Sequence, residues 1–102
     1  MSTIEQQLAG PEPGLNQAKI LVCDGAQNVR LLTRQCLEAE GMLVVEAANG
    51  EEAVQLFSSE RPDLVFLDVE MPGMTGLEAC QQIRELRQGE SIPIMIVTGS
   101  DD

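Results

Sequence analysis

The chain has 102 residues, of which 43% are apolar, and its 17 acidic residues against 6 basic ones give a net charge of −11. That length suits one small domain, and so acidic a surface repels phosphate backbones, which argues against direct nucleic-acid binding. The absence of histidine excludes a Ser-His-Asp triad, a histidine-ligated zinc and an imidazole base.

Two features bear on where the protein works. The sequence shows neither a signal-peptide pattern at its start nor the ~20 consecutive apolar residues of a membrane span. Its three cysteines are an odd number, lie far apart and each fall on an apolar face of a predicted element: Cys23, Cys36 and Cys80. We interpret them as reduced core thiols rather than disulfide partners or metal ligands, and we expect a cytoplasmic protein with no membrane contact.

Residues 1–18 differ from the rest of the chain. They contain Gly10, Pro11, Pro13 and Gly14 and show little apolar periodicity. We interpret them as a flexible N-terminal tail, which leaves residues 19–102 as the folded part.

The first half of the folded part alternates short apolar runs with a helical pattern. Lys19–Cys23 and Leu43–Ala47 are predicted as strands, and Asn28–Glu40 between them as a helix. Gly41 suits the position just after that helix. The helix is expected to bury one face, formed by Val29, Leu32, Cys36 and Leu37.

The second half continues the same rhythm. Asn49, three residues before Glu52, is the predicted N-cap of a second helix that turns Ala53, Leu56 and Phe57 inward. Leu64–Leu67 and Ile94–Val97 are predicted strands. A third helix lies between them, and its expected apolar stripe is Leu77, Cys80, Ile83 and Leu86.

Thr75 and Glu78 form a capping box at the start of the third helix. The resulting order is βαβαβαβ, and the strands are almost wholly apolar. Both features are typical of an α/β fold whose parallel sheet is covered by helices on both faces.

Polar residues follow three of the predicted strands. Asp24 follows the first strand, Asp68 the third and Thr98 the fourth, and ligands of open α/β sheets bind at the carboxyl ends of the strands. Two neighbouring carboxylates suit Mg²⁺, and a carboxylate beside that cation can attack a phosphoryl group. A hydroxyl such as that of Thr98 could hydrogen-bond the phosphoryl oxygens.

Taken singly, Asp24 would be interpreted as a turn residue, and Thr98 is uninformative. Asp68 differs because the turn of Met71, Pro72 and Gly73 leads from it into a well-capped helix. No Gly-x-Gly-x-x-Gly follows the first strand and no Walker sequence is present, so nucleotide binding in those modes is unsupported. A small aspartyl phosphatase using Asp68 and Glu70 is a rival, but it would need acid–base and cap elements that so short a chain cannot hold.

Three stretches, ILVCDGAQNVR, DLVFLDVEMPGMTGLE and IPIMIVTG, resemble the receiver domain of bacterial two-component response regulators, from about Ile20 to the last residue. The resemblance implies a flavodoxin-like (CheY-like) sheet of strand order 2-1-3-4-5. It also implies that Asp68 accepts a phosphoryl group from a histidine kinase or a phosphotransfer protein, with Mg²⁺ as cofactor. Asp24 matches the first metal-ligating acid, Glu70 the position whose backbone carbonyl reaches the metal, and Thr98 the switch hydroxyl.

This sequence departs from the family pattern at two positions. Gly25 stands where the second acid is usual, so we expect weak Mg²⁺ binding, since this ion is held by few carboxylates. The lysine that follows strand five in the family has no counterpart, because the chain ends at Asp102, before the last strand and last helices. The alternative to a phosphorylated module is therefore a degenerate receiver that serves as a protein-interaction scaffold. The effector, the kinase and the pathway are not identified by the sequence.

The predicted fourth strand also raises the question of self-association. Ile94–Val97 is apolar on both faces, and nothing in this chain would pair with its outer edge. An exposed apolar edge is a template for another chain. We therefore expect a dimer joined through Ile92–Thr98 or through swapped elements, rather than a monomer.

Overall fold

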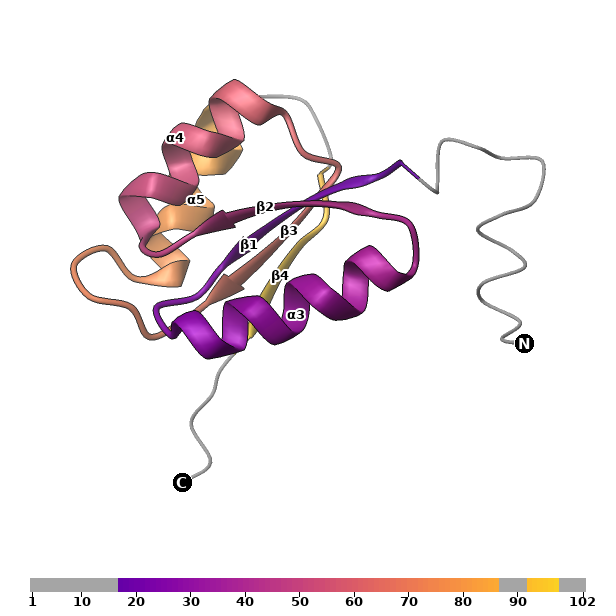
Figure 1. Ribbon diagram of the computed structural model, residues 1–102. Coiled ribbons are helices and arrows are strands. Elements are labelled where there is room, and N and C mark those ends of the chain that lie inside the picture. Colours follow the sequence, from indigo (N-terminus) through magenta and orange to yellow (C-terminus); the bar gives the residue numbers. More distant parts are fainter. Residues whose placement is uncertain (1–16, 87–91, 98–102) are drawn as a thin grey trace.

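The computed structural model describes residues 17–86 and 92–97. Four strands and three helices alternate along the chain (Figure 1): β1 (Lys19–Cys23), α3 (Gln27–Ala39), β2 (Leu43–Ala47), α4 (Gly50–Glu60), β3 (Leu64–Asp68), α5 (Gly76–Leu86) and β4 (Ile94–Val97). The strands are all parallel and lie in the order β2-β1-β3-β4. The predicted α/β fold, with its crossover from β2 past β1 to β3, is confirmed.

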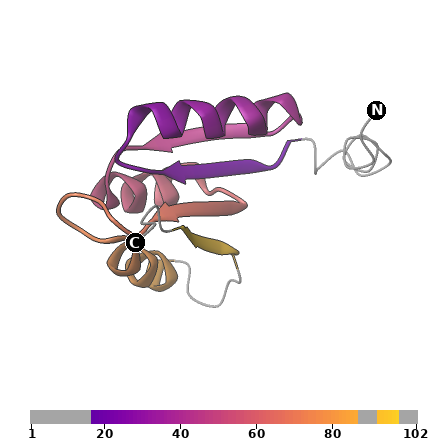
Figure 2. The same cartoon turned by 90° about the horizontal axis from the view of Figure 1, so that it is seen from below.

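The helices lie on both faces of the sheet. Figure 2 shows α3 alone on one face and α4 and α5 together on the other. The main core lies between the sheet and the α4–α5 pair and is formed by Leu21, Cys23, Ala47, Ala53, Phe57, Val65, Leu67, Met71, Ala79 and Ile83. Because side chains alternate along a strand, the neighbouring positions Val22, Phe66, Met95 and Val97 belong to the α3 face.

The helix starts form as their sequences predict. The Asn49 side chain accepts a hydrogen bond of 2.8 Å from the amide of Glu52. The capping box of α5 is complete, because the Glu78 amide donates to Thr75 Oγ1 (3.2 Å) and the Thr75 amide donates to Glu78 Oε1 (3.0 Å). Gly41 follows α3 with a φ of +90°, a conformation that glycine adopts without strain.

The predicted buried face of α3 is wrong for most of its members. Leu32 is 61% exposed, Val29 and Cys36 are exposed, and only Leu37 is half-buried. The reason is that α3 packs on β1 and β2 alone, with no second helix beside it on that face in the part of the chain that the structure describes. Its apolar stripe is therefore only half covered, and Cys36 is not a core thiol. Cys23 is buried and Cys80 packs against the core, and all three thiols are free.

The stripe predicted for α5 is correct at its centre and wrong at its ends. Ile83 is buried and Cys80 packs on the core, but Leu77 and Leu86 are 61% and 49% exposed. Gly76 and Ala79 are buried instead. At Gly76 the helix approaches β3 closely, since a Cβ there would lie 2.9 Å from the Asp68 carbonyl carbon.

The predicted tail at residues 1–18 lies almost wholly outside the described residues, as does Thr98. Among the residues that the structure does describe, no helix has the length and apolar character needed to cross a membrane.

Candidate functional site

Asp24 and Asp68 meet at the carboxyl edge of the sheet. Asp24 directly follows β1 and Asp68 ends β3, and these two strands are hydrogen-bonded neighbours. Both carboxylates line one cavity of about 220 Å³, whose walls also include Val22, Cys23, Val29, Thr33, Phe66, Leu67 and Val97. Both acids thus lie at one edge of the sheet and line one cavity, while their sharing of a metal ion and the place of Thr98 stay predictions.

Asp68 is half-buried and held at the end of its strand. Its Oδ1 accepts a 3.3 Å hydrogen bond from the amide of Glu70. Burial raises the pKa of Asp68 above its ordinary value, the Glu70 amide opposes this shift, and the carboxylates of Asp24 and Glu70 add to it. The raised pKa reflects a negative charge that the protein itself leaves partly uncompensated.

Asp24 is fixed through its main chain and one carboxylate oxygen. Its amide donates to the carbonyl of Ala47 (3.1 Å), and its Oδ1 accepts from the amide of Ala26 (2.8 Å). Arg30 Nη1 donates to its carbonyl oxygen at 2.7 Å. Within the described residues no hydrogen bond occupies Oδ2, so this oxygen is free to bind a ligand.

The donor set at this edge fits a hard divalent cation. Neither Asp24 nor Asp68 forms an ion pair with a basic side chain in residues 17–86 or 92–97, and Mg²⁺ is commonly bound through one or two carboxylates with water completing its shell. No cluster of three or more His, Cys, Asp or Glu side chains able to hold a metal occurs in the same ranges. Gly25, next to Asp24, offers no side-chain ligand, so the side-chain oxygens that this edge can offer come from Asp24 and Asp68.

Glu70 is exposed, and its amide rather than its side chain contacts Asp68. The predicted role of the Glu70 carbonyl as a metal ligand stays a prediction. The rival hypothesis, an aspartyl phosphatase, uses the Glu70 carboxylate together with Asp68. In the described residues, no hydrogen bond joins these two side chains.

Cys23 lies beside the acids but is not a nucleophile. Its thiol donates to the Asn49 carbonyl (3.3 Å) and lies 3.2 Å from the sulfur of Met71. Burial, followed by the nearby carboxylates of Asp24 and Asp68, raises the pKa of Cys23 to about 12. The thiolate is therefore absent at neutral pH, and Cys23 acts as a small apolar core residue.

Two residues contribute to this site without having been predicted from the sequence. Arg30 contacts the Asp24 carbonyl. Its place one helical turn before Arg34 indicates the shared pairing with Glu46 but not this contact. Gly76 matters because the start of α5 approaches the end of β3 closely, a contact that no sequence pattern shows. A Cβ at Gly76 would lie 2.9 Å from the Asp68 carbonyl carbon and even closer to its oxygen.

We expect Gly76→Ala to destabilise the fold by about 1–3 kcal/mol, because the added methyl group meets rigid backbone and forces α5 away from β3. Urea unfolding followed by circular dichroism measures the change. Gly25→Ala is the matched control, since its Cβ would meet Pro72 Cδ at 3.6 Å and the Ala48 carbonyl oxygen at 4.0 Å, both ordinary contacts. Equal midpoints for the two variants would contradict the close-approach interpretation.

Comparisons with known proteins agree with this geometry. The family model described as "Response regulator receiver domain" matches residues 20–102. Response regulator MprA of Mycolicibacterium vanbaalenii is 43% identical over 83 residues, which are 81% of this chain and 35% of that protein. The alkaline phosphatase synthesis transcriptional regulatory protein PhoP of Bacillus subtilis is 39% identical over 84 residues, 82% of this chain and 34% of that protein. The chain thus spans about a third of the length of these curated relatives.

Solved structures show the same fold. The response regulator TrrA of Thermotoga maritima, in complex with Mg²⁺-BeF, superposes with a TM-score of 0.76 and 40% identity over 83% of this chain and 72% of that one. The chemotaxis protein CheY4 of Vibrio cholerae gives a TM-score of 0.78 and 32% identity over 84% and 72% of the respective chains. With an acid pair at the carboxyl edge of a parallel sheet and a family model matched from residue 20 to the last, the chain belongs to the response regulator receiver domain family of two-component signalling.

Proposed function

We propose that Asp68 is the phosphoacceptor of this receiver domain and that its phosphorylation carries the signal. The observation that supports this most strongly is the placement of Asp68 beside Asp24 in one cavity, with no basic side chain of residues 17–86 or 92–97 paired to either acid. An unpaired, half-buried carboxylate at the ligand-binding edge of the sheet is available both as a nucleophile and as a cation ligand.

In the proposed step, a carboxylate oxygen of Asp68 attacks phosphorus and forms a new P–O bond. The P–N bond of a phosphohistidine on the donor breaks, and its electron pair stays on the imidazole nitrogen. When bound, Mg²⁺ would neutralise phosphoryl oxygens and allow the two anions to approach. Asp24 and Asp68 would hold the ion through their carboxylates, with the main-chain carbonyl of Glu70 as a third donor.

The test is incubation with Mg²⁺ and a small-molecule phosphodonor such as acetyl phosphate, followed by intact mass spectrometry. We expect a phosphate-sized gain that is removed by hydroxylamine, as an acyl phosphate should be, and that is lost completely in Asp68→Asn. Asp63→Asn is the matched control, because Asp63 is an exposed acid directly before β3, at the end opposite to Asp68. A gain that persists in Asp68→Asn would overturn the assignment.

The second candidate is a degenerate receiver that works as a protein-interaction scaffold without phosphorylation. Gly25 favours it, because this position offers no carboxylate to the cation. Absence of any mass gain in the parent chain, together with retained fold, would support this candidate. We propose no enzymatic turnover in either case, and steady hydrolysis of a phosphoester would contradict that.

The proposed partners follow from the same chemistry. The donor would be a histidine kinase or a phosphotransfer protein, and the reader of the phosphorylated state would be an effector that the sequence does not identify. A cytoplasmic site of action and no direct contact with nucleic acid are proposed from the charge and composition. We also propose that this chain self-associates through β4, whose outer edge has no neighbouring strand in the described residues.

A further inference from the structure

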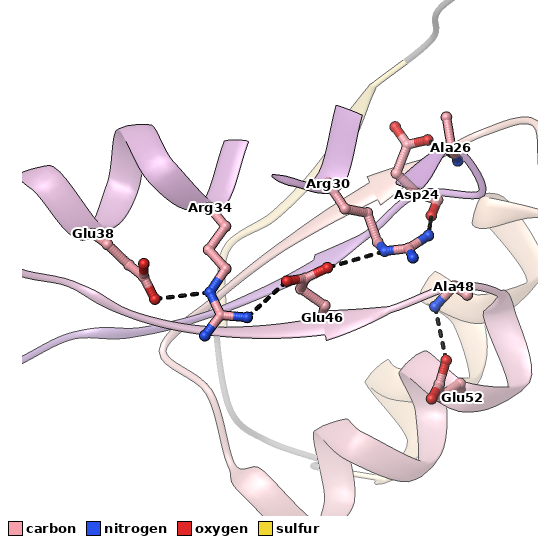
Figure 3. A network of polar contacts seen from close by, with 8 residues as sticks. All are labelled: Asp24, Ala26, Arg30, Arg34, Glu38, Glu46, Ala48 and Glu52. Carbon is pink, nitrogen blue, oxygen red and sulfur yellow. Dashed lines mark hydrogen bonds and ion pairs between the residues drawn. The ribbon is translucent and has the colours of Figure 1, made fainter. Parts of the chain in front are cut away.

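A chain of alternating charges runs along the surface between α3 and β2 (Figure 3). Arg34 Nε donates to Glu38 (2.8 Å), its Nη1 donates to Glu46 Oε2 (2.8 Å), and Arg30 Nε donates to Glu46 Oε1 (3.2 Å). The two arginines therefore share one carboxylate on β2. They differ in what lies beyond it, because only Arg30 reaches the loop that carries Asp24.

The Arg30 side chain is the more enclosed of the two. It is 14% exposed, whereas that of Arg34 is 43% exposed. Its guanidinium spans from Glu46 on β2 to the Asp24 carbonyl after β1, with the shorter bond, 2.7 Å, to the carbonyl. A charge-assisted hydrogen bond of this length in a partly buried place is among the stronger contacts available to a loop.

The Asp24 main chain is consequently held on both sides. Its amide is bound to Ala47 and its carbonyl to Arg30, and its Oδ1 is bound to the Ala26 amide. These three contacts leave Oδ2 as the oxygen without a hydrogen bond in the described residues. With Gly25 next to it, Asp24 is the one acidic side chain of this loop, so its orientation decides what the loop can offer a cation.

We propose that Arg30 is a positioning residue that fixes the Asp24 carboxylate for cation binding, and that Glu46 neutralises its charge. The first part follows because the hydrogen bond from Arg30 to the Asp24 carbonyl fixes the main chain from which the Asp24 carboxylate projects. The second follows from proximity, because an unpaired guanidinium beside a cation site would repel the ion. Hydrogen bonds from Arg34 and Arg30 lower the pKa of Glu46, so this carboxylate is ionised at neutral pH.

Arg34 supplies a control within the same network. Arg34→Gln removes an ion pair to Glu46 and another to Glu38 but touches nothing in the Asp24 loop. Arg30→Gln removes one ion pair to Glu46 and the contact to Asp24. A role of Arg30 limited to surface stability would make the two variants alike, since exposed ion pairs each contribute little.

The experiment is an NMR titration with Mg²⁺ alone, following the amides of Asp24, Ala26 and Glu70 in ¹⁵N-labelled protein. We expect Arg30→Gln to weaken binding about tenfold, the usual scale for a group that orients a metal ligand. Arg34→Gln should leave the dissociation constant unchanged. Glu46→Gln should weaken Mg²⁺ binding in the parent chain, because it leaves the Arg30 guanidinium uncompensated. The same substitution should have a smaller effect in the Arg30→Gln background, where that guanidinium is absent. Arg30→Lys should weaken binding, since one ammonium reaches only one of the two acceptors. The loss should be smaller than in Arg30→Gln, because the lysine keeps a charged donor.

Equal dissociation constants for the parent and Arg30→Gln, or equal losses in Arg30→Gln and Arg34→Gln, would overturn the inference. Circular dichroism of each variant shows that it is folded, and Arg30→Lys keeps the test valid if Arg30→Gln unfolds. The inference rests on the proposed cation site but not on phosphoryl transfer. A parent chain that binds Mg²⁺ without gaining phosphate would leave the role of Arg30 standing while refuting the proposed phosphoacceptor.

Discussion

Gly25→Asp is expected to strengthen Mg²⁺ binding at least about tenfold. Two unit charges 4 Å apart interact by about 4 kcal/mol at an effective dielectric constant of 20, and tenfold in affinity requires only about 1.4 kcal/mol. The tenfold gain in affinity therefore remains even if desolvation cancels a large part of the Coulomb energy. The gain in Mg²⁺ affinity is expected because Gly25 directly follows Asp24, at the sheet edge where Asp24 and Asp68 line one cavity.

The structure has room for the added side chain. A Cβ at Gly25 would lie 3.6 Å from Pro72 Cδ and 4.0 Å from the Ala48 carbonyl oxygen, and Gly25 is not among the residues with positive φ. The substitution therefore adds a carboxylate without backbone strain. Any change in affinity can then be assigned to charge and coordination.

Titration calorimetry with Mg²⁺ is the measurement, and Gly25→Asn is the control of equal shape without the charge. The asparagine variant should gain much less than the aspartate variant. Without metal, the added carboxylate should raise the pKa of Asp68 further above its ordinary value. Because ionised Asp68 is disfavoured in the folded state, metal-free Gly25→Asp should become more stable as the pH falls through that raised pKa. Equal Mg²⁺ affinity in the parent and in Gly25→Asp would show that the loop does not contact the ion.

The elements that the sequence predicted well are those set by local chemistry. Asn49 and the pair Thr75 and Glu78 cap their helices through contacts within four residues, and the apolar strand of Leu64–Leu67 ends at Asp68 as its pattern indicates. Parallel order then brings Asp24 and Asp68 to one edge, because consecutive strands of such a sheet end on the same side. The acid pair could thus be predicted from two short stretches.

The failures concern faces whose burial depends on a distant partner. The periodicity of α3 shows that Leu32 is on its apolar side but not whether another element covers that side. In α5, Leu77 has the spacing of a core residue, yet it is exposed, and its neighbour Gly76, in close contact with the Asp68 carbonyl, is buried instead. The contact of Arg30 with Asp24 needs the turn geometry of the loop, which no periodicity contains.

The uncovered part of the α3 face has a consequence for the chain in solution. Met95 and Val97 are 54% and 48% exposed, and Phe66 beside them on β3 is half-buried. In residues 17–86 and 92–97, β4 pairs with β3 alone, and Ile94–Val97 contains no charged residue to blunt its other edge. Edges of this kind pair with other chains.

We expect the chain of residues 1–102 to form a two-fold symmetric dimer in which the β4 edges of two copies pair, since an isologous contact closes on itself. Each copy carries a net charge of −11, so added salt should strengthen the dimer by screening the repulsion. Gel filtration with light scattering at micromolar concentration, at low and high salt, measures both effects.

Met95→Lys should give a monomer, because a charge in the middle of an edge strand opposes pairing. This substitution makes the chain less negative and so lowers long-range repulsion, which means that dissociation would be due to the edge itself. Leu43→Lys is the matched control, since Leu43 is 52% exposed on β2, the opposite edge strand, and this variant should remain dimeric. A parent chain that is monomeric at high salt, or a dimer that persists in Met95→Lys, would refute pairing through β4.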